Sequence, residues 1–456
     1  MSTPLVQSTP RLTLDASMVA EATAALREAN LAFARAHPGE SAGRQPVHTV
    51  YGGAQLFAAD SAPKIGRLAL RAMEEYADTP AMVGTALGIS DHPALSTIFT
   101  RVREKLAREA VEDFRIDFED GYGNRADTEE DHHAGVVAGE VLGGMRERTL
   151  PPFIGIRVKP LNEELRARSI RTLDLVTTAL VEGGGLPERW IVTIPKVTII
   201  EQVDFTVAVL RNLERALGLS DGTLRFEVMV ETPQIVLDAA GTSLLPRILD
   251  ASDGRLSGAH FGTYDYTASC NITASYQRMR HSACEFAKQF MQVAFAGTGV
   301  WLSDGSTTVM PVPLHRQADG GPPLTDAQRA ENVQSVHAAW RLHFDDVRHS
   351  LSGGFYQGWD LHPAQLVSRY AALYSFFLDG IDAAGARLAN FVKRAAQATL
   401  VGDVFDDAAT GQGLLNFFLR GINSGAITEE EALAMTGLTA EEFRGRSFVK
   451  ILRGRK

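Results

Sequence analysis

A regular alternation of short apolar runs with helix-length amphipathic segments is the feature that most constrains the fold of this chain. The alternation begins near residue 48 and ends near residue 362. Strands that alternate with helices predict a parallel sheet covered by helices, and eight such units predict an α/β fold, the (β/α)8 TIM barrel. The expected strands are His48–Phe57, Val111–Glu119, Phe153–Pro160, Trp190–Val197, Phe226–Glu231, Ser257–Tyr264, Val300–Pro311 and Phe355–His362.

The same pattern predicts three parts of the chain. Residues 1–45 form a polar tail and one helix, whose apolar spacing ends before Pro38-Gly39. Residues 46–363 form the TIM barrel, the part expected to carry a catalytic site, and residues 364–456 form a helical C-terminal region. A chain of 456 residues is long enough for one barrel and a smaller appended region.

Polar side chains follow the apolar residues of six expected strands. Barrel enzymes place their sites at the carboxyl ends of the strands, so we expect these side chains to meet at one rim. Alternation within Phe226–Glu231 puts Glu227 and Glu231 on one face, which is expected to face the barrel axis. The rim residues are Asp117, Glu119, Asp120, Arg157, Lys196, Glu231, Asp265 and His362.

Glu231 and Asp265 end two consecutive expected strands of the sheet. Two carboxylates with several waters suit a hard divalent cation such as Mg²⁺, and Mn²⁺ is a second candidate. The alternative is that each acid is a solvated strand end or a helix cap, as single acids usually are.

Six short motifs resemble those of the citrate lyase β-subunit, malyl-CoA lyase and HpcH/HpaI aldolase group and of the malate synthases, in the same order. These families share a barrel that bears Mg²⁺, so the resemblance implies that Glu231 and Asp265 are metal ligands. The first expected strand departs from the family because it lacks an Arg-Ser/Thr-x-Leu signature. The motifs are Arg115-Ile-Asp-Phe-Glu-Asp120, Gly155-Ile-Arg157-Val, Ile194-Pro-Lys196-Val, Val230-Glu231-Thr-Pro, Phe261-Gly-Thr-Tyr-Asp265 and Leu361-His-Pro-Ala-Gln365.

A metal ion with open positions can polarise the carbonyl of a 2-oxo acid, and Arg157 beside it would neutralise the enolate or alkoxide that develops. Glu119 and Asp120 are expected to hold water and to orient Arg157, although Asp120-Gly121 is also a common turn pair.

Three further residues complete the expected site. The backbone around Gly262 and Thr263 could receive a substrate carboxylate, since glycine allows close approach. Lys196 is either a substrate-binding residue or part of the scaffold.

Asp407 is the candidate proton-transfer residue. The stretch Phe405-Asp-Asp407-Ala-Ala-Thr410 resembles the Glu-Asp-Ala-Ala-Thr stretch of malate synthases, whose Asp removes a proton from an acetyl methyl group. The resemblance implies the same role for Asp407. The alternative is a helix N-cap, because Asp is a favourable capping residue.

The residues predict an Mg²⁺-dependent lyase or aldolase that acts, through a metal-stabilised enolate, on a small 2-oxo or 2-hydroxy acid, free or as a CoA thioester. The first alternative is a malate synthase-like Claisen condensation of glyoxylate with acetyl-CoA. The second is a barrel that binds a small acid without catalysis.

Composition excludes other classes of function. A formal charge of -10 argues against nucleic acid as a partner, and no apolar run approaches the length of a membrane span. Only two cysteines are present, without metal-binding spacing, which is typical of a protein in the reducing cytoplasm. We expect a cytoplasmic homo-oligomer.

Overall fold

Eight parallel strands close into a barrel in chain order, which confirms the predicted TIM barrel. The computed structural model describes residues 13–39, 43–395 and 408–455. The strands are β1 (Thr49–Gly53), β2 (Asp113–Asp117), β3 (Phe153–Arg157), β4 (Trp190–Ile194), β5 (Arg225–Val230), β6 (Leu256–Phe261), β7 (Trp301–Ser306) and β8 (Gln357–Asp360).

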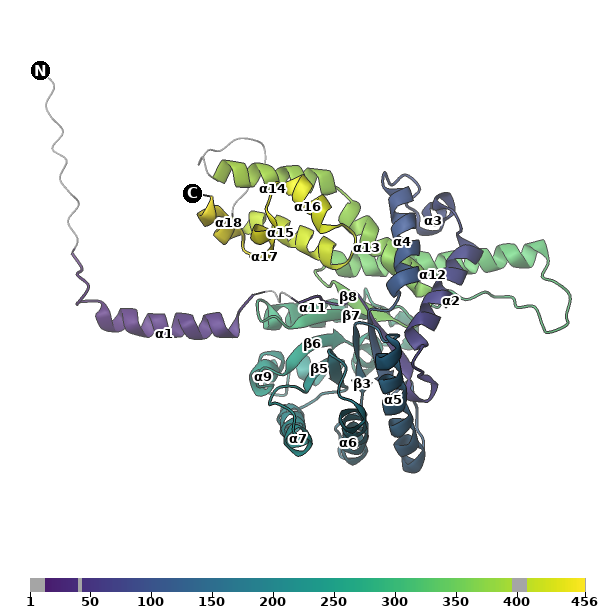
Figure 1. Cartoon of the computed structure of the whole chain (residues 1–456), viewed down its shortest axis with the longest axis horizontal. Helices are drawn as coiled ribbons and strands as arrows, with labels where there is room; N and C mark the ends of the chain where they lie inside the picture. Colours follow the sequence, from purple (N-terminus) through teal and green to yellow (C-terminus); the bar gives the residue numbers. More distant parts are fainter. Residues whose placement is uncertain (1–12, 40–42, 396–407, 456) are drawn as a thin grey trace, which may run out of the picture.

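Helices cover the outside of the barrel between successive strands (Figure 1). Those between β1 and β5 are α2 (Ser61–Tyr76), α3 (Pro80–Leu87), α4 (Leu95–Glu109), α5 (Asp127–Glu147), α6 (Arg166–Gly183) and α7 (Glu201–Leu217). Those after β5 are α8 (Pro233–Val236), α9 (Leu245–Ala251), α10 (Thr263–Ser269), α11 (Ser282–Phe295), α12 (Asp326–Ser352) and α13 (Gln365–Leu378).

Side-chain alternation along the strands sorts apolar from polar residues, as the sequence predicts. Phe114 and Ile116 of β2 are buried in the hydrophobic core between the barrel and its helices. Arg115 points to the axis, where its Nε and Nη2 atoms donate to Glu227 at 2.8 and 2.9 Å. The Nε2 atom of His260 lies 2.9 Å from Oε2 of the same carboxylate. A buried ionic network therefore fills the barrel interior.

The structure corrects three expected element boundaries. β1 ends at Gly53, where a 3-10 turn begins, and α3 was not predicted. β6 ends at Phe261, so Asp265 lies in the first turn of α10 and not at a strand end. Helix α13 covers the eighth strand, and its Tyr370 is buried in the barrel core. The barrel therefore extends beyond residue 363.

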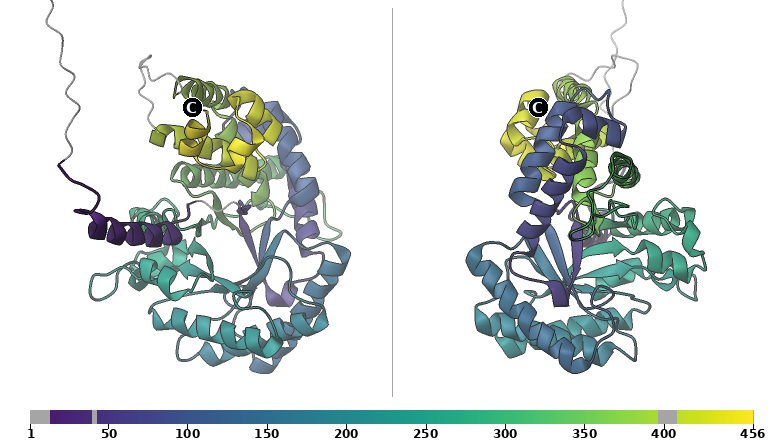
Figure 2. Two further views of the ribbon diagram at one scale, coloured as in Figure 1. Left: turned by 60° about the vertical axis from the view of Figure 1, so that its left-hand side comes forward. Right: turned by 90° about the vertical axis from the view of Figure 1, so that its right-hand side faces the viewer.

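The C-terminal helices form a second hydrophobic core and gather at the side of the molecule where α13 and α4 lie (Figures 1 and 2). Asn423 joins them to the barrel, because its side chain exchanges hydrogen bonds of 3.1 and 2.8 Å with the backbone of Gln45. Gln45 in turn donates to the carbonyl of Leu302 in β7. The helices are α14 (Ile381–Ala395), α15 (Ala408–Asn423), α16 (Glu429–Thr436), α17 (Ala440–Arg444) and α18 (Phe448–Gly454).

Gln45 precedes β1 and contacts the start of β7, so α15 packs at the end of the barrel opposite to the carboxyl rim. The N-terminal helix α1 (Ala20–Ala36) buries none of its residues and projects from the body in Figure 1. Within the part of the chain that the structure describes, no helix has the length and apolar content needed to cross a bilayer.

Gly155 in β3 offers a test of how tightly the barrel is packed. A Cβ atom at this position would lie 1.7 Å from the carbonyl oxygen of Ile191 in β4. We expect Gly155→Ala to lower the free energy of unfolding by about 1 to 3 kcal/mol or more, measured by denaturant titration. Gly139→Ala is the control. Gly139 is an exposed residue of α5, a Cβ atom there would meet nothing within 4 Å, and alanine favours a helix. Equal stability of the two variants would contradict this prediction.

Candidate functional site

The carboxyl rim of the barrel is organised around the guanidinium of Arg157, the last residue of β3. Its Nε and Nη2 atoms donate to the two oxygens of Asp117 at 2.7 and 2.6 Å. Its Nη1 atom lies 2.9 Å from Glu119 Oε2. Arg157 is only 4% exposed, so its position is fixed by two carboxylates and not by solvent.

Asp117 ends β2 and is the main partner of Arg157. It accepts two further hydrogen bonds, from the backbone N–H groups of Glu119 at 3.0 Å and of Gly121 at 2.7 Å. Burial alone would raise the pKa of the Asp117 carboxyl, but Arg157 and the two N–H groups hold it below its usual value. Asp117 therefore stays ionised and clamps the arginine.

Two aromatic rings support Arg157 from inside the barrel. The guanidinium carbon lies 4.8 Å from the ring centre of Tyr51 and 5.9 Å from that of Trp359. The two rings are 4.4 Å apart, centre to centre. Neither residue was predicted as part of the site. Their inward positions in β1 and β8 were the only available signal, since an aromatic residue in a strand is more often simply a core residue.

Lys196 follows β4 and lies within the acidic rim. Its backbone N–H donates to Glu231 Oε1 at 2.8 Å, and its φ angle of 51° is in the left-handed region, which is uncommon outside glycine. Its ammonium contacts Glu119 and lies 3.4 Å from Asp120 and 3.6 Å from Asp265. Because burial opposes the charge but these acids favour it, the pKa of Lys196 is raised overall. The structure thus brings Lys196 into the predicted site.

Glu231 follows β5 and is as buried as Asp117, at 1% exposed. Burial raises the pKa of its carboxyl to about 8, with further contributions from the negative charges of Glu119 and Asp265. Such a group is stabilised in its ionised form by a nearby cation. Asp265 is 41% exposed and reaches the same cluster from α10.

Gly262 packs closely against Glu231, and its backbone N–H does not fit the predicted role of binding a substrate carboxylate. A Cβ atom here would lie 2.5 Å from the Cβ and Oε2 atoms of Glu231. Its N–H donates to the carbonyl of Val230 at 3.0 Å, so it cannot also receive a substrate carboxylate. The neighbouring hydroxyl of Thr263 is buried and has no hydrogen-bond partner among the described residues. Thr263 therefore remains a candidate for substrate binding.

Among the described residues, His362 makes no hydrogen bond or ion pair with this cluster. His362 accepts a hydrogen bond of 3.2 Å from the N–H of Ala364, in the turn that precedes α13. Asp407 lies outside the described residues. Asp120 is more than half exposed, and it lies near Lys196 in the turn that Gly121 closes onto Asp117.

The donor set at the rim fits a hard cation. Glu231 and Asp265 supply oxygen atoms only, and the negative charges of Glu119 and Asp265 add to the burial that raises the pKa of Glu231. Over residues 13–39, 43–395 and 408–455, no three His, Cys, Asp or Glu side chains are grouped as a metal site. Two carboxylates with waters and substrate are nevertheless the usual ligands of Mg²⁺ in enzymes.

The pKa of Glu231 predicts how pH affects the protein. Folding raises this pKa from 4.5 to about 8, so the fold favours the protonated acid. Without metal, stability should fall as pH rises from about 5 to 8 and should change little above that. Because a metal needs the ionised acid, Mg²⁺ affinity should rise up to about tenfold per pH unit over this range, with release of a proton. Calorimetry in two buffers of different ionisation enthalpy measures the Mg²⁺ affinity and the proton release. An Mg²⁺ affinity that does not change with pH would contradict the prediction.

A comparison with one solved structure agrees with this architecture, and a second similarity is weaker. The structure of a citrate lyase from Burkholderia xenovorans LB400 shares the fold, with a TM-score of 0.52 and 18% identity over 75% of this chain and 92% of that chain. A malate synthase from Haloferax volcanii, in complex with magnesium and glyoxylate, gives a TM-score of 0.46 with 14% identity over 91% of this chain and 98% of its own.

One curated relative shares a short stretch of sequence. The L-malyl-CoA/beta-methylmalyl-CoA lyase of Haloarcula marismortui is 41% identical over 75 residues, which are 16% of this chain. The match spans 20% of the length of that lyase. The resemblance to the citrate lyase β-like superfamily, predicted from six motifs, is thereby confirmed. A family model described as "Domain of unknown function (DUF6986)" matches residues 26–451, and the chain belongs to that family.

Proposed function

We propose that the protein is an Mg²⁺-dependent carbon–carbon lyase or aldolase that acts on a small 2-oxo or 2-hydroxy acid, either free or as a CoA thioester. The observation that carries this proposal is the buried Arg157 guanidinium, held by Asp117 and Glu119 on the same rim as Glu231. The fold that the chain shares with a citrate lyase and its short match to a malyl-CoA lyase also support it.

Each rim residue has a task in such a reaction. Mg²⁺, held by Glu231 and Asp265, would act as a Lewis acid toward the substrate oxygens. Arg157 would neutralise the negative charge that builds up when the carbon–carbon bond breaks or forms. Glu119 keeps Arg157 in place and also contacts Lys196.

Lys196 and Thr263 are the residues that we propose bind a substrate carboxylate, with Asp120 beside Lys196. Lys196 would attract the carboxylate by its charge, and the unpaired Thr263 hydroxyl could donate to it. Asp120, exposed beside the ammonium, would hold water and limit how far Lys196 moves. These roles are proposals that substitution can test.

A malate synthase-like condensation of glyoxylate with acetyl-CoA is the second candidate. It is favoured by the sequence around Asp407, which would remove the proton from the acetyl methyl group. Asp407→Asn should then abolish exchange of acetyl-CoA methyl protons and leave Mg²⁺ affinity intact. If activity is unaltered, Asp407 is not the base.

Proton exchange is the direct test of the proposed function. The protein should exchange the methyl protons of pyruvate with D2O in the presence of Mg²⁺, followed by NMR, and EDTA should stop the exchange. Cleavage of 2-hydroxy acids and their CoA thioesters to 2-oxo acids should show the same dependence. Binding of these acids without exchange or turnover would favour the third candidate, a non-catalytic barrel.

A further inference from the structure

Helix α1 carries an apolar face that the described parts of the chain leave open to solvent. Its apolar residues recur at alternating spacings of four and three, as in helices that pack along one another. The large side chains of this face, Leu26 and Phe33, are 61% and 65% exposed. We call it the α1 face, and it consists of Ala22, Leu26, Ala29, Phe33 and Ala36.

A helix this exposed gains little stability from its own chain. Helix α1 has 17 residues and buries none of them. Isolated helices of about 12 to 15 residues are marginal in water, because most helical stability in proteins comes from packing of an apolar face. The N-cap residue, Val19, offers no side-chain hydrogen bond to the first turn. A packing partner for the α1 face is therefore expected.

Helix α11 has a second exposed apolar face. Phe286, Phe290 and Val293 lie on one side of this helix, again at spacings of four and three. Phe286 is 45% exposed, Val293 is 83% exposed, and the two phenylalanine rings lie 4.9 Å apart, centre to centre. These three residues are the α11 face. Exposed aromatic side chains that gather in this way mark interaction surfaces, whereas single exposed apolar residues do not.

No charge interrupts the α11 face. Glu285 and Lys288 are the only charged residues of α11, and both pair within the chain. Lys288 is buried, with its Nζ atom 3.1 Å from Asp304 and 2.9 Å from Glu285. Glu285 also lies 3.0 Å from His349. Depletion of charge around aromatic residues is typical of the core of a protein–protein interface.

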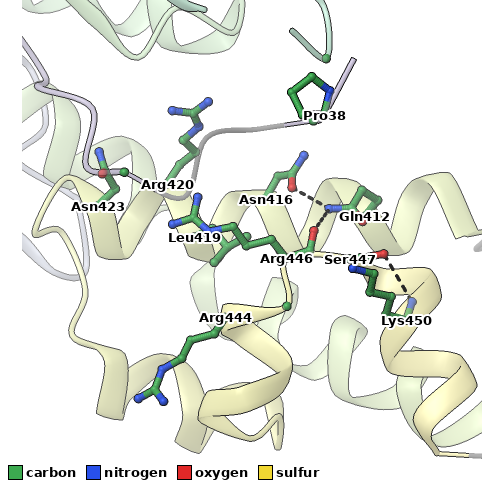
Figure 3. Close-up of a pocket in the computed structure, with 14 residues that line it drawn as sticks. Pro38, Gln412, Asn416, Leu419, Arg420, Asn423, Arg444, Arg446, Ser447 and Lys450 are labelled. Carbon is green, nitrogen blue, oxygen red and sulfur yellow. Dashed lines mark hydrogen bonds between the residues drawn. The ribbon is translucent and has the colours of Figure 1, made fainter. Parts of the chain in front are cut away.

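The end of α1 is fixed next to the end of α11. The N–H of Gly39 donates to the carbonyl of Gly297, two residues after α11 ends, at 2.8 Å. Pro38 and Gly297 line one cavity with Gln412 and Asn416 of α15 (Figure 3). From this point α1 runs away from the body (Figure 1), so the α1 face does not cover α11 of its own chain.

The short connection opposes a turn of α1 back onto its own α11. Only His37 and Pro38 separate the helix from the anchored Gly39. Pro38 restricts His37 to extended conformations, and the ring of His37 stacks on that of Phe33 with their centres 4.3 Å apart. A reversal of direction in this space would break the stack or the hydrogen bond. The α11 helix of a second copy can approach the α1 face from outside without changing this connection.

We propose that two copies of the chain form a symmetric pair in which α1 of each copy packs along the α11 face of the other. Ala22 and Ala29 leave room between the helices for the rings of Phe286 and Phe290, so that large side chains meet small ones. Two-fold symmetry forms this contact twice. At about 100 Å² for each large side chain, the two contacts would bury roughly 1,200 Å², the lower end of stable interfaces.

Sedimentation equilibrium of the full-length protein at micromolar concentration tests this proposal. It should give the mass of two chains, or of a larger even number of chains. The mass of a single chain would overturn the proposal and would agree with α1 folding back onto its own α11. The mass of an odd number of chains would also overturn it, because a symmetric exchange pairs every copy with one other.

Phe33→Glu and Val293→Lys test the two faces. Each puts a charge into the contact, so each should raise the dissociation constant of the pair by about 30-fold or more. Both side chains are exposed in the single chain, so neither change should disturb the barrel, which circular dichroism checks.

Leu31→Glu is the matched control for Phe33→Glu. Leu31 is 51% exposed on the same helix, but it lies about 140° around the helix from Leu26. The control should therefore keep the native dissociation constant. Equal effects of Phe33→Glu and Leu31→Glu, or no effect of either face variant, would overturn the proposal.

A mixture of the two face variants shows whether the contact joins different chains. A pair of one Phe33→Glu chain and one Val293→Lys chain contains one native contact and one contact in which glutamate meets lysine. Mixing should therefore restore pairs at a concentration where each variant alone is a single chain. Mixing cannot restore a contact that forms within one chain, so a mixture that stays as single chains would overturn the exchange of α1.

Discussion

Glu231→Gln is expected to lower turnover by at least about 10³-fold, because a metal that polarises a carbonyl contributes several kcal/mol to the transition state and each 1.36 kcal/mol is tenfold. Glutamine keeps the shape and can still accept the N–H of Lys196, which now donates to Glu231 at 2.8 Å. The substitution removes a ligand charge and little else. Mg²⁺ affinity, measured by calorimetry, should fall together with turnover.

The same variant makes a second, opposite prediction for stability. Burial and the negative charges of Glu119 and Asp265 disfavour the ionised form of Glu231, and a neutral amide does not have this cost. Without metal, Glu231→Gln should therefore unfold at the same temperature as the native protein or above it. Glu104→Gln, at an exposed acid on α4, is the matched control. Native Mg²⁺ affinity and turnover in Glu231→Gln would exclude this residue as a ligand.

Arg157→Lys is expected to lower turnover by about 10²- to 10³-fold, the usual effect of losing one donor to a developing oxyanion. Lysine keeps the positive charge, but it cannot form the two-pronged contact with Asp117 or lie flat against Tyr51. The loss should fall mainly on kcat, because the interaction strengthens in the transition state.

Three measurements separate this role from a purely structural one. Mg²⁺ affinity should be unchanged in Arg157→Lys, since Glu231 and Asp265 remain. Thermal unfolding shows whether the barrel is intact. Arg166→Lys, at an exposed arginine on α6 paired with Glu163, is the control and should be fully active. A kcat within about twofold of the native value would show that Arg157 does not stabilise the reaction's charge.

Much of the rim could be predicted because the positions of its polar residues follow from the strand pattern. Alternation along β5 placed Glu227 and Glu231 correctly, and the strand-end position placed Arg157 beside the acids. A strand has a two-residue period, so the face that each side chain occupies follows directly from the sequence.

Other parts of the site depend on contacts that no local pattern contains. The sequence could not show that Arg157 would lie against Tyr51 and Trp359, which are far apart in the chain and meet only when the barrel closes. It placed Asp265 at a strand end, whereas Gly262 ends the strand early to make room for Glu231. The position of α15 at the other end of the barrel likewise depends on contacts between distant parts of the chain, such as those of Asn423 and Arg420 with Gln45.

An ammonium group already standing among Glu119, Asp120 and Asp265 means that the rim is never a bare cluster of negative charge. If the rim binds Mg²⁺ as proposed, Lys196 holds part of the metal's place in the metal-free protein and would have to turn away from Asp265. The rate of metal binding would then depend on a side-chain rotation as well as on diffusion. The lysine released in this way would lie at the edge of the rim, where an acidic substrate needs a positive charge.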